Sequence, residues 1–566
     1  MTILSDNARQ IVESRYLNES DGNWEGLCKR VGSGIAVYDP EYADRFIEQL
    51  YDQKFLGAGR ILRNTGKLKG SLLNCFHLGI GDSIEEIGQF LRDALILWSE
   101  GGGVGTTLSH LRPRGASIKH KGGTSSGPLS FLRAIDAAAT TVESGGSRRA
   151  AGLAELGCYH PDIQEFIKAK AIDGLLTTFN LSVGITEDFL SAVERNDNWN
   201  LAFGNTTYGS VEAKALWADI IDLMLNHAEP GMLFTDNLKR NNSYYFHPIS
   251  GVNPCGEATL GDKEACDLGS INLSKFVDPS GRTKWTDLAN TIGLAVRFLD
   301  NVLDINNYAL QDIRINAQNG RRIGLGVFGL AEYLFLKKIR YGSPESLETV
   351  EKLMKFLSVT AYESSVKLAR EKGCFPKFDS TLYTKADYVR KLPASLRMDI
   401  KRSGIRNVTL LAMPPTGTTS LLADCTSGIE PLFAKAYKRA DRVSERIYVH
   451  PQYKAILETE GRTPEWFVDT NDLTPKDHFE MQAVVQKYTD GSVSKTVNLP
   501  KDIDRNDFSE LLLEYAKDLK GVTCYRDGCK GSQPLNYISE AETLKHLSET
   551  SEGVAESACP TGKCSI

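Results

Sequence analysis

NPCGEATLGDKEAC, residues 253–266, is the stretch from which the fold and the chemistry of this chain are best inferred. Its proline and its first glycine disfavour a helix, so we predict an extended or looped segment. Side chains alternate along an extended backbone, which would put Asn253, Cys255 and Glu257 on one side. They would supply a hydrogen-bonding amide, a redox-active sulfur and a general base, and Cys266 suggests that the chemistry leaves a disulfide. The alternative is a turn that holds an inert buried thiol.

Composition limits the class of protein. The chain has 566 residues, of which 41% are hydrophobic and 24% charged, as is typical of a soluble protein. Its net charge of −6 gives no electrostatic reason to expect direct nucleic-acid binding. There is no apolar run near the roughly 18–20 residues that span a bilayer, and the N-terminus lacks a signal-peptide pattern. We therefore expect a cytoplasmic protein without a membrane partner.

The cysteines do not form a metal-binding or disulfide framework. Eleven of them are spread along the chain, no CxxC pair occurs, and the nine histidines do not cluster beside them. In a reducing compartment such cysteines are buried thiols or catalytic ones. We expect no bound metal.

Helical and strand patterns alternate along the chain. Asp82 and Ser83 can cap a helix that continues to Trp98 and stops at the glycines 101–103. Strands interleaved with helices predict an α/β architecture with catalytic loops at strand ends. Further helices are predicted near 284–304 and 346–371, and strands at 179–183, 322–327 and 408–413.

Three other segments could carry chemistry. Residues 407–420, NVTLLAMPPTGTTS, predict a strand, a loop and a helix start, where free backbone N–H groups can bind an anion. No lysine follows, so this is not a Walker A loop, and a simple structural turn is the alternative. The glycines of GGGVG (101–105) are weak evidence for nucleotide binding. The tail 559–566, CPTGKCSI, has two cysteines that can close a small ring, as in a mobile, swinging dithiol.

Together these motifs resemble the catalytic subunit of ribonucleotide reductases. The resemblance runs from about Ser14 to the C-terminus. It rests on GRILRNTG (59–66), LLNCFHLG (72–79), GGGVGTTLSHLRPRG (101–115), SGGSRRAAGLAELGCYHPDIQEFI (144–167), FNLSVGIT (179–186), EPGMLFTDNLKRN (229–241), NPCGEATL (253–260), CDLGSINLS (266–274), RRIGLGVFGLAEYL (321–334), PPTGTTSLLADCTSGIEPLF (414–433) and KGVTCYRDG (520–528).

The resemblance implies a role for each residue of the opening motif. Cys255 matches the cysteine that becomes a thiyl radical and abstracts the 3′ hydrogen of the ribose. Glu257 matches the carboxylate that takes the 3′-OH proton, so we expect it to be ionised in a hydrogen-bonded setting. Asn253 matches the amide that holds the substrate hydroxyls. Cys75 and Cys266 match the pair that supplies two electrons and is oxidised to a disulfide.

The same resemblance assigns the tail and the phosphate loop. The tail pair Cys559 and Cys564 would re-reduce the internal disulfide and be recharged by thioredoxin or glutaredoxin. The substrate phosphates would be held by Thr416, Gly417, Thr418, Thr419 and Ser420. Whether the ribonucleotide substrate is a diphosphate or a triphosphate stays open.

The implied fold is a ten-stranded α/β barrel with Cys255 on a central finger loop. We expect an N-terminal helical region over residues 1–70 and the catalytic barrel over 71–535, with the finger loop around 250–270. Residues 536–566 would form the flexible redox tail.

The radical source separates two branches of the family. In class II, adenosylcobalamin bound to the same chain generates the radical; in class I, a separate metal-containing beta subunit passes it through two adjacent tyrosines near the C-terminus. Here that region reads Cys524-Tyr525-Arg526, and the adjacent pair Tyr244-Tyr245 lies elsewhere. Although the tail resembles the short class I ending, we favour class II, with a compact class I-like subunit as the alternative.

Regulation is implied in part. We expect no ATP-cone domain, because the chain begins close to the barrel's N-terminal helices. Segment 112–127, which contains Arg112, resembles the first effector loop and 145–153 the second, and in the family these loops bind dNTP or ATP at a homodimer interface. Asp82 matches an aspartate that contacts the effector, and Arg148 matches the arginine that senses the substrate base. A solvated surface pair is the alternative for Arg148 and Arg149. Two other functions are compatible with the sequence. The chain could be a reductase-like protein that binds nucleotides without catalysis, or a thiol protein with a terminal metal site.

Overall fold

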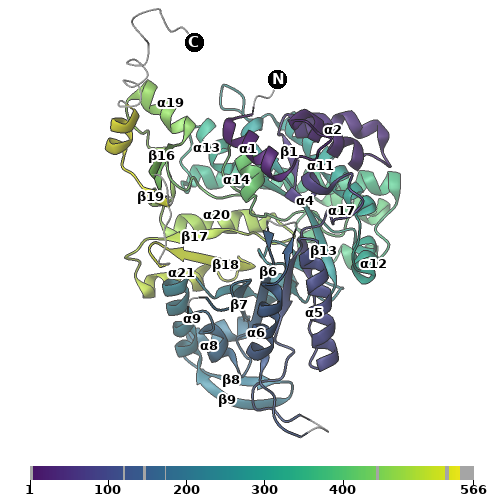
Figure 1. The fold of residues 1–566 in the computed structure, drawn as a ribbon, viewed down its shortest axis with the longest axis vertical. Coiled ribbons are helices and arrows are strands. Elements are labelled where there is room, and N and C mark those ends of the chain that lie inside the picture. The colour runs from purple at the N-terminus through teal and green to yellow at the C-terminus, as the bar shows by residue number, and fades with distance from the viewer. Residues whose placement is uncertain are drawn as a thin grey trace, which may run out of the picture.

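A computed structural model describes residues 4–118, 122–144, 148–172, 174–440, 445–529 and 535–547 (Figure 1). The predicted redox cysteines of the tail, Cys559 and Cys564, lie outside these residues.

A ten-stranded mixed sheet forms the centre of the molecule and confirms the predicted α/β class. Its order is β1-β13-β2-β3-β6-β7-β10-β18-β17, with β14 beside β13. The strands from β2 to β10 run parallel to one another. At one side β2 pairs antiparallel with β13, which is parallel to β14, and at the other side β10 pairs antiparallel with β18, which is parallel to β17. The strands are β1 (Phe55–Gly57), β2 (Cys75–His77), β3 (Gly103–Thr107), β6 (Ala151–Gly157), β7 (Phe179–Ile185), β10 (Gly231–Phe234), β13 (Glu264–Asn272), β14 (Ile323–Phe328), β17 (Thr496–Leu499) and β18 (Gly521–Arg526).

The strand predicted at 408–413 is not a regular strand. It forms only two parallel bridges, from Leu411 to Leu325 of β14 and from Met413 to Val493 before β17. Its geometry has a clear cause, because the amides of Leu410 and Leu411 donate to the carboxylate of buried Asp490 at 2.9 and 2.8 Å instead of to a neighbouring strand. The two bridges link β14, which pairs with β13, to the segment that leads into β17 at the other side of the sheet.

The N-terminal region is helical, as predicted, and packs beside the sheet. Arg30 holds it together, since its guanidinium pairs with Asp21 at 2.7 Å and donates to the carbonyls of Tyr16, Leu62 and Thr65. Asp424, just after α18 (Gly417–Leu422), accepts a 2.9 Å hydrogen bond from Ser5, which fixes the first helix against the predicted phosphate loop. The helices of this region are α1 (Asp6–Arg15), α2 (Trp24–Ile35), α3 (Ala43–Tyr51) and α4 (Gly59–Asn64).

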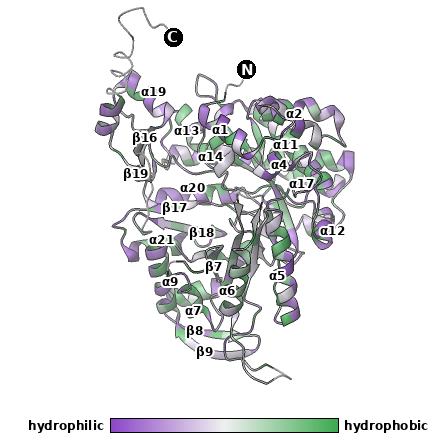
Figure 2. Cartoon of the chain, in the orientation of Figure 1, coloured by the Kyte–Doolittle hydropathy of each residue, from purple (hydrophilic) through white to green (hydrophobic). Residues whose placement is uncertain are grey.

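The long helices predicted to follow Ser83 and to lie near 284–304 and 346–371 are all present, and further helices surround the sheet (Figure 1). Helix α5 (Ile84–Ser99) begins at the Ser83 cap, whose side chain accepts from the Glu86 amide. The short outer helix α12 (Gln311–Gly320) is mainly hydrophilic, whereas other helices carry more hydrophobic residues (Figure 2). The remaining long helices are α6 (Pro128–Ala139), α9 (Ala213–His227), α11 (Trp285–Ile305), α14 (Pro344–Lys372), α20 (Pro475–Lys487) and α21 (Arg505–Tyr515).

Two smaller units extend from the sheet. The hairpin β8 (Asn198–Phe203) with β9 (Thr206–Glu212) lies at one end, beyond α9 (Figure 1). At the other end, β15 (Ala436–Ala440), β16 (Glu445–Val449) and β19 (Leu535–Tyr537) form a three-stranded sheet beside α19 (Pro451–Glu460). No helix in the described residues is both long and apolar enough for a membrane span.

Candidate active site

The opening motif forms the tip of a short hairpin, and not an extended segment. Strands β11 (Gly251–Val252) and β12 (Thr259–Leu260) pair antiparallel, and the chain reverses between them. Asn253 closes this turn, because its side-chain oxygen accepts from the Ala258 amide at 2.9 Å and its carbonyl accepts from the Gly256 amide at 3.0 Å. Gly256 adopts a φ of +79°, which favours glycine. The predicted alternation is therefore wrong: Asn253 and Glu257 are buried and Cys255 is exposed at the tip.

Asn253 and Glu257 converge on Cys75. The Asn253 side-chain amide donates to the Cys75 sulfur at 3.1 Å, and that thiol donates to Glu257 Oε1 at 3.4 Å. The second carboxylate oxygen, Oε2, is buried and has no hydrogen-bond partner among the described residues. A donor from a bound molecule would satisfy it, since an unpartnered buried acceptor is costly.

Cys75 and Cys266 lie directly opposite each other on β2 and β13. Directly opposed residues of antiparallel strands have Cβ atoms about 4.5–5.5 Å apart, which is near the spacing of a disulfide. Both are thiols in this structure, 5% and 1% exposed. Two residues far apart in the sequence are thus positioned to exchange two electrons as a pair.

Burial controls the ionisation of this cluster. Desolvation raises the pKa of Glu257 above its ordinary value, although hydrogen bonds from Asn253 and Cys75 partly oppose it. Desolvation is the largest cause that raises the pKa of both thiols well above the usual range. The next cause is the negative charge of Glu257 for Cys75 and that of Asp267 for Cys266. The predicted hydrogen-bonded setting of Glu257 is therefore only half right, because one oxygen is bonded and the other is not. At neutral pH the redox pair is protonated.

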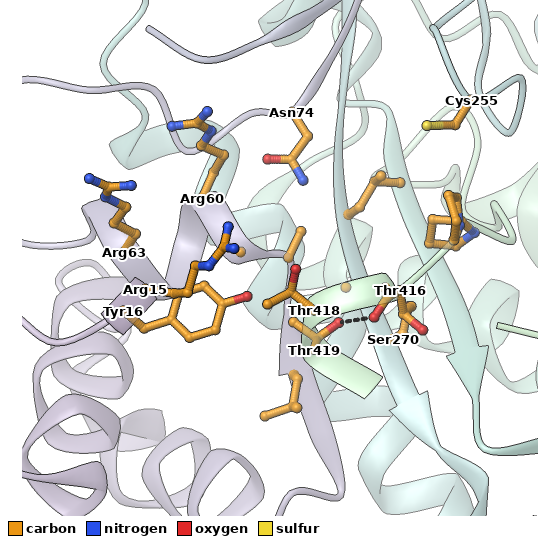
Figure 3. Close-up of a pocket in the computed structure, with 18 residues that line it drawn as sticks. Arg15, Tyr16, Arg60, Arg63, Asn74, Cys255, Ser270, Thr416, Thr418 and Thr419 are labelled. Carbon is orange, nitrogen blue, oxygen red and sulfur yellow. Dashed lines mark hydrogen bonds between the residues drawn. The ribbon is translucent and has the colours of Figure 1, made fainter. Parts of the chain in front are cut away.

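A first cavity of about 420 Å³ lies on one side of Cys255 (Figure 3). The predicted phosphate loop forms part of its wall through residues 414–419. Thr416 is fixed from both sides, because its amide donates to Ser427 and its hydroxyl accepts from the Gly428 amide. The amides of Gly417, Thr418 and Thr419 begin helix α18 and so have no intrahelical acceptor. Ser420 is buried behind the loop and does not line this cavity.

A second cavity of about 250 Å³ reaches Cys255 from the side of β10 and β18. Its charged groups are compensated: Glu229 pairs with Lys170 at 2.7 Å and Lys495 with Glu430 at 2.6 Å. Other lining residues are Asn180, Ser182, Pro254, Gly256, Ser494, Thr523, Cys524 and Tyr525. A third cavity of about 400 Å³, lined by Phe433, Asn498, Lys501 and Tyr537, shares Tyr525 with the second.

Both parts of the chain match families of known proteins. Residues 73–525 match the model described as "Ribonucleotide reductase, barrel domain", and residues 3–70 match "Ribonucleotide reductase, all-alpha domain". The chain belongs to the ribonucleotide reductase family.

Curated relatives cover most of the reductase. A "Vitamin B12-dependent ribonucleoside-diphosphate reductase" of Mycobacterium tuberculosis is 37% identical, over 98% of this chain and 82% of the relative. A protein of the same name from Thermoplasma acidophilum is 35% identical, over 92% of this chain and 72% of the relative. A "Ribonucleoside-diphosphate reductase subunit alpha" of Chlamydia muridarum is 25% identical, over 98% of this chain and 62% of the relative.

The predicted effector residues lie apart from the reductase's cavities. Arg112 and Asp82 pair with each other, with the guanidinium Nε 2.7 Å from the carboxylate and the Arg112 amide 2.9 Å from it. Arg148 belongs to β5 (Arg148–Arg149), which pairs with β4 (Glu143–Ser144), and its side chain is outside what the structure describes. In the described part of the chain, no group of three or more His, Cys, Asp or Glu side chains could hold a metal ion.

Sequence reasoning missed the cationic side of the first cavity. Arg15, Arg60 and Arg63 line it, together with Asn74, whose side-chain oxygen is buried without a hydrogen-bond partner. The motif GRILR (59–63) contains two of these arginines, but only their packing beside the Thr416 loop reveals a shared site. The glycines of GGGVG do not form a nucleotide loop, because Gly103 begins strand β3.

Proposed function

We propose that this chain is an adenosylcobalamin-dependent, class II ribonucleotide reductase that converts ribonucleoside di- or triphosphates to 2′-deoxyribonucleotides. The observation that carries the proposal is the position of Cys255 where two separate cavities meet. One cavity is lined by the threonine loop and three arginines, and the other has room for a radical source. The names of the relatives from M. tuberculosis and T. acidophilum support the cobalamin assignment.

The site residues divide the reaction between them. A thiyl radical on Cys255 removes the 3′ hydrogen atom of the ribose, while Glu257 accepts the 3′-OH proton through its unpartnered Oε2. Asn253, fixed by the Ala258 amide, orients the hydroxyls. Cys75 gives a proton to the departing 2′-OH, which leaves as water. Cys75 and Cys266 together supply two electrons and two protons and join as a disulfide, and Cys255 returns the hydrogen atom to C3′.

The second cavity fits part of the cofactor. Its volume of about 250 Å³ is below the roughly 300–1,000 Å³ of drug-sized pockets, so a nucleoside-sized group fits and a corrin ring does not. A side chain at Gly256 would meet nothing within 4 Å, so the backbone beside Cys255 is open to a ligand. Ser182, Asn180 and Thr523 would hydrogen-bond the nucleoside, and the adjoining third cavity would take part of the corrin. The chemistry that adenosylcobalamin supplies when bound is homolysis of its cobalt–carbon bond, the radical source for Cys255.

The class I alternative lacks a matching feature here. Radical transfer from a beta subunit needs a tyrosine pair near Cys255, whereas Tyr525 is flanked by Cys524 and Arg526. Cys524 is 1% exposed, and burial raises its pKa, so it is a neutral thiol beside the cavity.

The proposal extends to the rest of the catalytic cycle. Cys559 and Cys564 would re-reduce the Cys75–Cys266 disulfide, with thioredoxin or glutaredoxin as the external reductant. Asp82 and Arg112 would contact a dNTP or ATP effector at the interface of a cytoplasmic homodimer, and Arg148 would sense the substrate base. In the expected division, residues 1–70 form a helical region, 71–535 the catalytic barrel and 536–566 the redox tail.

Anaerobic turnover tests the function. The purified chain is incubated with CDP or CTP, dithiothreitol and a nucleotide effector, with and without adenosylcobalamin, and deoxynucleotide is measured by chromatography. We expect product only with the cobalamin. Product that forms only after a metal-containing beta subunit is added would overturn the class II assignment in favour of class I.

A further inference from the structure

We propose that Arg15, Arg60 and Arg63 form an arginine clamp that binds the phosphates of the substrate and selects a diphosphate. The inference deepens the proposed function, on which it rests, by naming the substrate's phosphate state. It also gives the N-terminal helical region a part in the active site.

The clamp and the threonine loop occupy two walls of the same cavity (Figure 3). Arg15 ends helix α1, and Arg60 and Arg63 belong to helix α4, so all three come from the N-terminal region. Thr416, Thr418 and Thr419 come from the opposite part of the chain, and Cys255 lies farther along the cavity. A nucleotide whose ribose lies at Cys255 would therefore extend its phosphates between the two walls.

Arg60 is positioned before any ligand arrives. Its guanidinium donates to the Gly101 carbonyl at 2.6 Å, and the residue is 7% exposed. Gly101 makes room for it, because a Cβ at this glycine would lie 1.5 Å from the Arg60 Nη2 atom. Gly101 also has a φ of +80°. The first glycine of GGGVG thus leaves space for the Arg60 guanidinium and accepts its hydrogen bond. A guanidinium that is already held in place loses less entropy when it binds a phosphate.

Among the residues that the structure describes, Arg15 and Arg63 find no partner for their charge. Within the described residues, neither makes a side-chain hydrogen bond or an ion pair. Arg30, which belongs to the same helical region, shows the contrast, since its guanidinium is fully engaged by Asp21 and three carbonyls. One arginine of this region holds the structure together, and two others face the cavity with donors to spare.

The charge of the cavity favours a diphosphate. Its lining includes three arginines and no aspartate or glutamate. One terminal phosphate carries roughly −1.5 to −2 and each bridging phosphate adds one further charge, so a nucleoside diphosphate has about −2.5 to −3 near neutral pH. Three guanidinium groups balance that charge. A triphosphate would bring about one more negative charge into the cavity, and partly buried charge without compensation is unfavourable.

Calorimetric titration of CDP, CTP and cytidine into Arg15→Ala, Arg63→Ala and the wild-type chain tests the clamp without turnover. Charge-assisted hydrogen bonds contribute about 1.5–3 kcal/mol, so each substitution should weaken CDP binding about 10- to 100-fold. Cytidine binding should not change. Arg9→Ala is the matched control, because Arg9 is an exposed arginine of the same helix that does not line the cavity.

Steady-state kinetics with CDP gives the second readout. The clamp predicts a raised KM with kcat within about twofold of the wild-type value, as expected when an interaction is made equally in the ground and transition states. Unchanged CDP affinity in both variants would overturn the clamp while leaving the proposed reductase activity intact. Tighter wild-type binding of CTP than of CDP would overturn the selection of a diphosphate. Equal losses for cytidine and CDP would show a structural effect and also overturn the clamp.

Discussion

The two cavities that meet at Cys255 differ in charge. The first has three arginines and no acidic side chain, and two of these arginines have no partner in the described structure. The second contains a glutamate and a lysine, but each is paired, with Lys170 and with Glu430. The first cavity is built to attract an anion, and the second to hold a group of little net charge.

This difference explains how one cysteine can serve two ligands. An anionic substrate is drawn to the arginine side, which is also lined by Cys255 and by Asn74, the residue before Cys75. A nucleoside-like radical source is not repelled by the other side, where the charges are compensated. The finger hairpin separates the two spaces and exposes Cys255 to both.

The largest expected effect comes from removing the Cys255 sulfur, which both cavities share. Cys255→Ser should lower turnover by at least about a thousandfold, because a hydroxyl does not replace the radical-forming thiol. CDP and adenosylcobalamin should still bind, since each has its own cavity. Deoxynucleotide formation measures the effect, and Cys374→Ser, a half-buried cysteine outside both cavities, serves as the control. Turnover by Cys255→Ser near the wild-type rate would contradict the account.

Next in size is the loss of the redox pair. Cys266→Ser should lower multiple turnover at least about a hundredfold, because no disulfide with Cys75 can form to release two electrons. In the wild-type protein, a single turnover without reductant should leave a Cys75–Cys266 disulfide, detected by peptide mass spectrometry. Two free thiols after that turnover would mean that other groups supply the electrons.

Filling the second cavity should impair the use of the cobalamin without affecting the binding of CDP. Thr523 lines that cavity and its side chain is exposed there, so Thr523→Trp should reduce cobalamin-dependent turnover about tenfold or more by steric exclusion. CDP affinity should stay within about twofold, because the first cavity is untouched. Thr523→Ser is the matched control. A parallel loss of CDP affinity would show that the two spaces are not independent.

A smaller effect concerns pH. Glu257 must be ionised to accept a proton, and burial raises its pKa above the ordinary 4.5. The acid limb of kcat/KM should therefore lie at a higher pH than that of a solvent-exposed carboxylate, with activity falling as the pH decreases through it. A pH–rate profile with CDP measures this limb. A limb at or below about 4 would mean that burial does not control this carboxylate.

The loss of stability at low pH has a different origin from the acid limb of kcat/KM. His77, two residue pairs along β2 and β13 from the cysteines, is fully buried, and burial lowers its pKa to about 4. The unfolded chain, with a pKa near 6.5, binds more protons between these values, so stability falls as the pH decreases from about 6.5 to 4. The loss for this group is about 3 kcal/mol. His77→Met should unfold less readily at pH 4.5 in urea titrations, and an unchanged pH dependence would contradict this origin.

The sequence predicted which helices and strands form better than it predicted their hydrogen bonding and the conformation of the loops. Helix α5 has both its cap and its apolar periodicity in the local sequence, so its start at Ser83 could be predicted. Segment 408–413 could not, because its amides bind Asp490, a partner far along the chain. The prediction that Asn253, Cys255 and Glu257 lie on one side was wrong for a related reason. Alternation assumes an extended backbone, whereas Asn253 closes a turn.

The candidate site shows the same limit. Cys75, Cys255, Cys266, Asn253 and Glu257 were assigned by resemblance, and four of them converge in space. The arginines were missed because nothing local marks Arg15 and Arg63 as neighbours of a threonine loop more than three hundred residues away. Cavities depend on tertiary packing, which periodicity along one chain does not describe.

The most direct test of two cavities at one cysteine is simultaneous binding. Adenosylcobalamin is titrated calorimetrically into Cys255→Ala protein, which cannot turn over, with and without saturating CDP. The account predicts that about one cobalamin binds per chain in both cases, because the ligands occupy different sides of the finger hairpin. Loss of cobalamin binding when CDP is present would contradict it, since the two ligands would then compete for one space.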